Sequence, residues 1–331
     1  MSDHVTLYAF DAENGDCLLL VNNTSGFTIL IDSGPSKKSV SDRLISDIEK
    51  ILPNKHINLA IVTHNDDDHI GGFKRFIKSG FSIEKFIFNS HDYIEKILKL
   101  ARDRKVSLRQ DIALTSNIKQ KIIELELGDN GYFKEIVIDV FKINFRSPNV
   151  EKLEKYKKWL VTERRKIRNI KVSKSTKFVS KDEAILFSSS DDYFQEDNRE
   201  PNGSSLALDI EFGSHKLLLL GDSHPSTVID SFDKEHKHSY DLVKVSHHGS
   251  HKNTNNALLS LLDCDEYLIC SNADNLHGHP SPITLLRIME SNKSSTIHVT
   301  KSNSNMRRID DEYGINFNYP HNNHLAFIYE F

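Results

Sequence analysis

Three short, largely apolar runs in this chain are each followed closely by histidine, aspartate or glycine residues. The pairs are Ile57–Val62 before Thr63–Gly72, Leu217–Leu220 before Gly221-Asp222, and Leu242–Val245 before Ser246–Ser250. A nearly continuous apolar run, such as Ile57–Val62, is typical of a strand covered on both faces. A tight turn after such a strand projects alternate side chains towards one point. The pattern therefore predicts a layered α/β fold with polar groups gathered at strand ends.

Composition limits the class of protein. The 331 residues allow one large domain or two smaller ones, and 38% hydrophobic residues exclude wholesale disorder. No apolar run approaches the ~20 residues that span a bilayer, and the N-terminus lacks a secretory signal. The cysteines Cys17, Cys264 and Cys270 are typical of reduced thiols, so we expect a cytoplasmic protein without a membrane anchor. A net charge of −4 argues against a generally basic nucleic-acid-binding surface.

Alternating strand and helix signals predict two sheets packed face to face with helices outside. The expected strands are Val5–Phe10, Asp16–Val21, Phe27–Ile31, Ile57–Val62, Ile136–Phe145, Ser205–Phe212, Lys216–Leu220, Leu242–Val245 and Tyr267–Ser271, followed by terminal strands. The expected helices are Lys38–Leu52, Tyr93–Ala101, Ile118–Leu125, Thr254–Leu262 and Pro282–Glu290.

The middle of the chain, residues 150–200, differs in composition and predicts an insertion within a single domain spanning 1–331. Residues 151–181 contain twelve Lys or Arg and three Glu, whereas residues 182–200 contain seven acidic residues and one Arg. Apolar residues in the basic part recur at helical spacing, which favours an amphipathic helix. We expect its cationic face, including Arg164, Arg165, Lys166 and Arg168, to bind a substrate polyanion. An ordinary solvated helix paired with the acidic run is the alternative.

The segment Thr63–Gly72 places two imidazoles and three carboxylates within six residues. One metal ion cannot use all these groups in so short a span, but two ions a few Å apart can. A solvated acidic loop is the alternative. Lone polar groups after the other strands, Asp222 and His247-His248, strengthen the interpretation as a metal site.

The segment Thr63-His64-Asn65-Asp66-Asp67-Asp68-His69-Ile70-Gly71-Gly72 resembles the first motif of the metallo-β-lactamase superfamily, His-x-His-x-Asp-His, with Asp66 replacing the second histidine. Further motifs occur in the order seen in the hydrolase domain of the competence DNA-uptake protein ComEC and its free-standing relatives. They are Asn14-Gly15-Asp16, Ile31-Asp32-Ser33-Gly34-Pro35, Asn202-Gly203-Ser204-Ser205-Leu206, Leu220-Gly221-Asp222, His247-His248-Gly249-Ser250 and Gly278-His279-Pro280. The resemblance implies a four-layer αββα sandwich carrying a basic helical insertion.

The resemblance also implies a centre for two divalent cations, Mn²⁺ or Zn²⁺. Its ligands would be His64 and Asp66 on the first ion, Asp68, His69 and His247 on the second, and Asp222 between both. The superfamily's third-motif histidine is absent, so Asn202 or Ser205 must substitute for it, or the first ion is held weakly.

Two close cations suit phosphodiester hydrolysis by a metal-bound hydroxide that Asp68 orients. His279 or His248 would protonate the leaving group. The resemblance and the basic segment favour a DNA nuclease. The alternatives are a phosphodiesterase for small or cyclic nucleotides and a partner-regulated subunit with an incomplete metal site. A further alternative keeps the fold without β-lactamase or lactonase chemistry, for which the sequence has no supporting motifs. A protein partner is also expected, and the ground for it is the resemblance to free-standing relatives with helical insertions.

Overall fold

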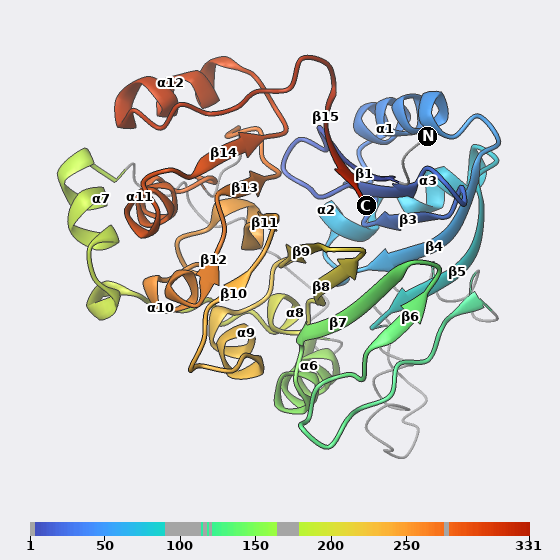
Figure 1. The fold of residues 1–331 in the computed structure, drawn as a ribbon, viewed down its shortest axis with the longest axis horizontal. Helices are drawn as coiled ribbons and strands as arrows, with labels where there is room; N and C mark the ends of the chain where they lie inside the picture. Colours follow the sequence, from blue (N-terminus) through green and yellow to red (C-terminus); the bar gives the residue numbers. More distant parts are fainter. Residues whose placement is uncertain (1–3, 90–113, 115–117, 119–120, 164–178, 275–277) are drawn as a thin grey trace.

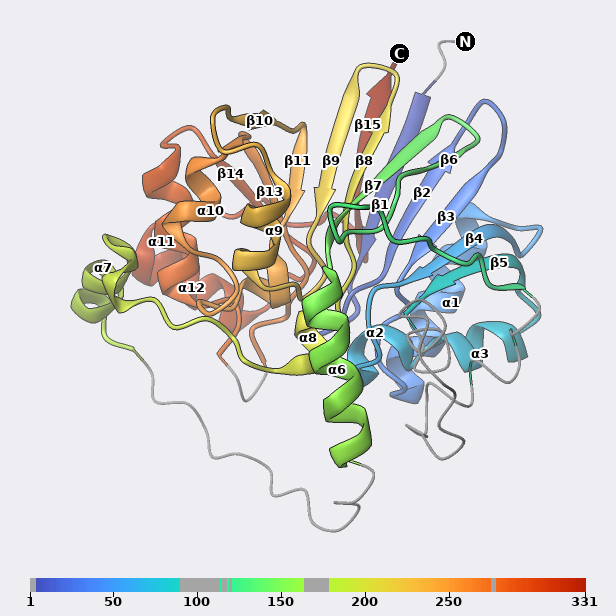
Figure 2. The ribbon, with the colours of Figure 1, turned by 90° about the horizontal axis from the view of Figure 1, so that it is seen from below.

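The computed structural model of the chain contains two β-sheets packed face to face (Figure 1). It describes residues 4–89, 114, 118, 121–163, 179–274 and 278–331. Helices cover the outer face of each sheet, so the order of layers is helix, sheet, sheet, helix (Figure 2). The predicted four-layer α/β architecture is confirmed.

The first sheet has six strands in the order β15-β1-β2-β3-β4-β5. Strands β3, β4 and β5 run parallel, whereas β15, β1, β2 and β3 alternate in direction. Their bounds are β1 His4–Phe10, β2 Leu18–Asn22, β3 Thr28–Ile31, β4 His56–Val62, β5 Ser82–Phe88 and β15 His324–Glu330.

The second sheet has seven strands in the order β14-β13-β11-β9-β8-β7-β6, and its first four strands run parallel. Their bounds are β6 Ile136–Ile138, β7 Phe141–Ser147, β8 Ala207–Phe212, β9 His215–Leu219, β11 Leu242–Lys244, β13 Glu266–Ile269 and β14 Thr296–Val299. The short strands β10, His238–Ser239, and β12, Leu262–Asp263, form a separate parallel pair.

Helices α1, Lys38–Ile51, and α3, Phe73–Lys78, pack on the first sheet. On the second sheet lie α7 Lys181–Ser188, α9 Pro225–Ser231, α10 Asn256–Ser260, α11 Pro282–Ser291 and α12 Ser304–Tyr313. The remaining helices are α2 Asp67–Ile70, α6 Val150–Glu163 and α8 Glu200–Gly203. Within the part of the chain that the structure describes, no helix is long and apolar enough to cross a bilayer.

Strand β4 shows why a nearly continuous apolar run forms a central strand. Successive side chains of a strand point to opposite faces. Leu59 and Ile61 therefore enter the core between the sheets, whereas Ala60 and Val62 pack under the helices of the first sheet. Because both faces are buried, β4 is fixed within the sandwich and positions the start of the loop that follows it.

Helix α6 belongs to the predicted insertion, and its apolar spacing is confirmed over Val150–Glu163. Leu153, Tyr156 and Leu160 are buried in the core between the two sheets. The helix therefore packs against the sandwich itself. Arg164, Arg165, Lys166 and Arg168 lie outside the described residues, so their binding to a polyanion stays a prediction.

Several boundaries differ from the sequence prediction. The expected strand Ile136–Phe145 is a hairpin, β6 and β7, because Asp139 adopts a left-handed turn conformation with φ of 53°. Residues 122–125 are not helical, and Ile122 bridges to Phe86 of β5 instead. The expected helix Tyr93–Ala101 lies outside the described residues. Strand β5 and helix α12 had not been predicted.

A buried ion pair joins the two sheets. Lys244, at the end of β11, donates a hydrogen bond to Asp16, which lies between β1 and β2, and another to the carbonyl oxygen of Gly221 at 3.1 Å. Both charged side chains are almost completely buried. Breaking such a pair leaves an uncompensated charge in the interior, which is strongly destabilising.

We expect Lys244→Met to lower the free energy of unfolding by about 3–5 kcal/mol, because Asp16 would remain buried without its cation. Urea denaturation followed by circular dichroism measures the change. The half-buried Lys216, paired with Asp209 and Glu211, provides the control: Lys216→Met should cost about 1 kcal/mol or less. Equal losses in both variants would show that the buried pair has no special role. The double variant Asp16→Asn/Lys244→Met should recover part of the loss.

Candidate metal centre

The loop after β4 carries the first group of candidate ligands, and Asp32 fixes its shape. The carboxylate of Asp32 accepts hydrogen bonds from the backbone N–H of Thr63 at 2.8 Å and from its hydroxyl at 2.7 Å. It also pairs with Nδ1 of His69 at 2.7 Å. With Nδ1 engaged in this way, Nε2 of His69 is the nitrogen left to bind an ion.

Asp222 follows β9 and lies at the centre of the cluster. Its backbone N–H donates to the hydroxyl of Ser205 at 3.0 Å, which fixes the turn after the strand. Its Oδ1 lies 3.3 Å from Nε2 of His69, and its Oδ2 lies 3.7 Å from Nε2 of His64. The two carboxylate oxygens therefore face different imidazoles.

His247 and His248 lie in a short turn, Ser246–Gly249, after β11, and both adopt left-handed backbone conformations with φ of 47° and 54°. Their rings are inclined by 72° to each other. Nε2 of His247 lies 3.6 Å from Oδ2 of Asp222, whereas Nε2 of His248 lies 3.9 Å from Oδ1. Adjacent residues thus approach opposite oxygens of one carboxylate.

The candidate ligand atoms can be grouped by the oxygen of Asp222 that they face, although ligand atoms of His64 and His69 also lie within 4.8 Å of each other. Nε2 of His248 also lies 3.3 Å from Oδ2 of Asp68, so Asp68, His69 and His248 form one set with Oδ1 of Asp222. The other set contains Nε2 of His64 and of His247 with Oδ2 of Asp222. The structure places His248 beside Asp68 and His69, where the sequence analysis had expected His247.

The donor atoms fit divalent cations. The Nε2 atoms of His64, His69 and His248 and the Oδ1 atom of Asp222 are buried and have no hydrogen-bond partner. Buried polar atoms are rarely left without a partner, which points to a ligand at this position. Two ligand atoms at ~2.0–2.2 Å from one tetrahedral ion are separated by roughly 3.3–3.6 Å. The observed spacings of 3.3–3.9 Å are close to that value.

The outer nitrogens of the histidines are held by the protein. Nδ1 of His248 donates to the carbonyl oxygen of Cys270 at 2.9 Å. Nδ1 of His247 lies 3.0 Å from the side-chain oxygen of Asn253 and 3.5 Å from Asp197. Such contacts fix the tautomer and orientation of a metal-binding histidine and leave Nε2 directed at the ion.

Electrostatics within the cluster favour positive charge. Burial, followed by the neighbouring His69, lowers the pKa of His64 to about 3, so this imidazole is neutral and able to bind an ion. Burial alone would also lower the pKa of His248, but Asp222, Asp16 and Asp68 raise it to about 10. The carboxylates around His248 thus favour positive charge at this position.

Asn202 and Ser205, the predicted substitutes for the third-motif histidine, lie behind the cluster. The side-chain amide of Asn202 donates to Asp197 at 2.5 Å and lies 3.3 Å from Nδ1 of His247. Ser205 accepts from the backbone of Asp222. Both side chains therefore contact residues of the cluster from outside. Asp66 and His279 lie at the edge: Asp66 pairs with Arg199, and the His279 ring is 5.1 Å from that of His247.

Sequence reasoning missed several residues that support the site. Asp16 and Asp32 belong to motifs identified in the sequence, but no role was predicted for either residue. Lys244 lies two residues before the turn that carries His247. Nothing in the sequence distinguishes Asp197 and Arg199 from the rest of the acidic run. Their contacts with His247 and Asp66 form only when the chain folds.

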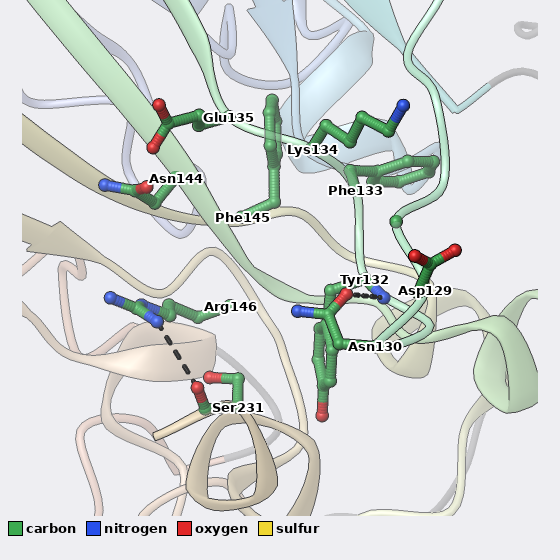
Figure 3. Close-up of a pocket in the computed structure, with 11 residues that line it drawn as sticks. Asp129, Asn130, Tyr132, Phe133, Lys134, Glu135, Asn144, Phe145, Arg146 and Ser231 are labelled. Carbon is green, nitrogen blue, oxygen red and sulfur yellow. Dashed lines mark hydrogen bonds between the residues drawn. The ribbon is translucent and has the colours of Figure 1, made fainter. Parts of the chain in front are cut away.

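A cavity of about 520 Å³ lies elsewhere, between the 128–135 loop, β7 and the end of α9 (Figure 3). Its lining includes Arg146, whose guanidinium is bound to Asp209 at 2.6 Å and to the carbonyl oxygen of Ser231 at 3.3 Å. None of the cluster residues lines this cavity. The candidate site therefore lies outside this cavity and is defined by its side chains.

Comparison with known proteins supports the fold. A family model described as the metallo-beta-lactamase superfamily matches residues 11–81, which contain the Asp16, Asp32 and His64–His69 segments. A comparison with curated proteins returns no match.

Solved structures that align with this chain include a diphosphatase from the PhnP family, with 10% identity and a TM-score of 0.44 over 100% of this chain and 99% of that one. A protein of Parabacteroides distasonis described as a metal-dependent hydrolase has 9% identity and a TM-score of 0.42 over 88% of this chain and 92% of that one. The diiron β-hydroxylase CmlA of Streptomyces venezuelae has 10% identity and a TM-score of 0.42 over 100% of this chain. This chain spans 55% of CmlA.

The family model covers the loops that carry Asp16, Asp32 and the first group of ligands, and the two sheets with outer helices extend the same architecture over the described chain. The fold of this protein is therefore that of the metallo-β-lactamase superfamily.

Proposed function

We propose that this protein is a metal-dependent phosphodiester hydrolase, and specifically a nuclease acting on DNA. The observation that carries the proposal is the convergence of buried, unpaired imidazole nitrogens on the two oxygens of Asp222. Divalent cations held there would supply Lewis acidity and lower the pKa of a bound water towards ~7. The order of motifs shared with the ComEC hydrolase domain favours DNA among phosphodiesters.

The proposed ligands follow from the geometry and from the resemblance. By geometry we assign Asp68, His69 and His248 to one cation, His64 and His247 to the other, and Asp222 to both. Asp66 is assigned to the cation of His64 and His247 on the resemblance alone. This division gives the cation bound by His64 a second histidine, His247, so neither Asn202 nor Ser205 is needed as a ligand. Imidazole and carboxylate donors without a thiolate suit Mn²⁺ as well as Zn²⁺.

The remaining steps belong to the protein side chains. Asp68, held beside His248, orients the attacking water and accepts its proton while the new oxygen–phosphorus bond forms. The bond from phosphorus to the leaving sugar oxygen then breaks, and that oxygen must gain a proton. His279, at the edge of the cluster beside His247, is the proposed donor. His248 is less suited to this role, because its Nδ1 is bound to Cys270 and its Nε2 faces the carboxylates.

The metal assignment predicts two cations per chain in the reconstituted protein. His247→Ala and His248→Ala should each leave about one cation, because each removes a ligand from a different set. Asp222→Asn should weaken both sites. Elemental analysis gives the stoichiometry, and electron paramagnetic resonance of the Mn²⁺ form reports loss of coupling between the ions. Two tightly bound ions in both histidine variants would contradict the assignment.

The nuclease proposal predicts that supercoiled plasmid or single-stranded DNA is cleaved when Mn²⁺ or Zn²⁺ is supplied. Asp68→Asn should lower the rate more than about 10²-fold while the protein remains folded, because the water loses the group that orients it. Gel electrophoresis and a cyclic-nucleotide assay run in parallel measure the activity. Turnover of cyclic nucleotides alone would replace DNA with a small substrate, and near-normal activity of Asp68→Asn would contradict hydrolysis at this centre.

The role of His279 is tested by the leaving group. His279→Gln should lower kcat on DNA by ~10²–10⁴, because the departing sugar oxygen needs a proton. Bis(p-nitrophenyl) phosphate releases a stable phenolate and should be much less affected. Metal content should stay unchanged. Equal losses on both substrates would assign His279 to binding or to structure.

A further inference from the structure

Among the residues that the structure describes, the candidate ligands differ in their exposure to solvent. The side chains of His64, His69, Asp222 and His248 are no more than 3% exposed. The side chains of His247, Asp66 and Asp68 are 17–27% exposed, and we call this part of the cluster its open side. A substrate that comes from solvent meets these three side chains first.

Arg199 lies on this open side. Its Nη2 atom is 2.7 Å from Oδ2 of Asp66, although 133 residues separate them in sequence. Its side chain is 54% exposed, more than any of the candidate ligands. The guanidinium therefore places a permanent positive charge at the entrance to the cluster.

The backbone of Arg199 is anchored while its guanidinium remains accessible. Its N–H donates to Oδ1 of Asp197 at 3.0 Å, and its carbonyl oxygen accepts from Gly203 at 2.9 Å. Asp197 is itself held by Asn202 and is largely buried. A guanidinium has five N–H donors. Within the described part of the chain, the acceptor it bonds is the carboxylate of Asp66, so donors remain for a ligand.

We propose that Arg199 forms a phosphate-binding subsite at the entrance to the metal centre, where it donates hydrogen bonds to a non-bridging oxygen of a phosphodiester. The inference rests on the proposed function and adds a residue from the insertion to the substrate site. A planar guanidinium binds phosphate through paired hydrogen bonds. Asp66 orients it through one nitrogen and leaves the remaining donors directed at solvent.

The alternative role for Arg199 is to neutralise Asp66 without contacting substrate. The two roles differ in what they change. If Arg199 binds phosphate, its removal weakens phosphate binding and raises the KM. If it only neutralises Asp66, its removal changes the affinity for the metal. Binding of inorganic phosphate to the metal-loaded protein separates them without relying on turnover.

Isothermal titration of the Mn²⁺-loaded protein with inorganic phosphate should show about ten- to a hundredfold weaker binding in Arg199→Gln, the usual loss for a hydrogen bond to a charged group. Mn²⁺ stoichiometry and affinity should stay unchanged. Arg199→Lys should recover part of the affinity for phosphate, because lysine keeps the positive charge but lacks the planar, paired N–H donors of a guanidinium. On DNA, the KM of Arg199→Gln should rise more than its kcat falls.

Arg75→Gln is the matched control, since Arg75 is also partly exposed and pairs with one aspartate, Asp42, at 3.1 Å. It should bind phosphate as the wild type does. Unchanged phosphate affinity in Arg199→Gln, or a loss of Mn²⁺ that accounts for the change, would overturn the subsite. If the wild type binds phosphate through Arg199 but cleaves no phosphodiester, the subsite stands and the proposed hydrolase function fails.

Discussion

The carboxylate of Asp222 is the contact on which the rest of the site depends. It lies after β9, between β4 of the first sheet and β11 of the second, and four imidazoles approach its two oxygens within 3.3–3.9 Å. Polar loops at the carboxyl ends of parallel strands meet at one edge of the fold, which is why residues distant in sequence converge there. A single buried carboxylate facing histidines from both sheets is stable only if positive charge accompanies it.

The backbone around this carboxylate is strained in a way that serves the arrangement. Consecutive non-glycine residues in left-handed conformations cost roughly 1–2 kcal/mol each. His247 and His248 both adopt them, and this conformation turns the two rings towards different oxygens of Asp222. Two hydrogen bonds stabilise the turn. The N–H of His247 donates to the carbonyl oxygen of Gly221, and the hydroxyl of Ser246 donates to the carbonyl oxygen of Ser223. The loop after β9 thus stabilises the loop after β11.

Much of the fold and about half of the site could be read from the sequence, for physical reasons that differ by residue. The loop after β4 was predictable because its ligands are close together and follow an apolar strand. The partition between His247 and His248 was not, because it depends on two backbone angles and not on residue type. Asp197 and Arg199 were read as part of a charged run, since a contact spanning 133 residues leaves no local pattern. Strand β5 was missed because Glu84 and Lys85 interrupt its apolar residues.

Residues at and just after the end of the predicted insertion contact His247 from outside the cluster. Asn202 and Asp197 lie behind His247 and contact its Nδ1 side, which leaves Nε2 facing the same oxygen of Asp222 as His64. Helix α6 buries Leu153 and Tyr156 in the core between the sheets, while Lys152 bonds to His224, two residues after Asp222. Within residues 150–163 and 179–205, which the structure describes, α6 is thus bound to the sandwich and Asp197 to His247. Asp197 belongs to the acidic run that composition alone would suggest to be solvated. Residues 197–202 therefore lie against one side of the candidate centre.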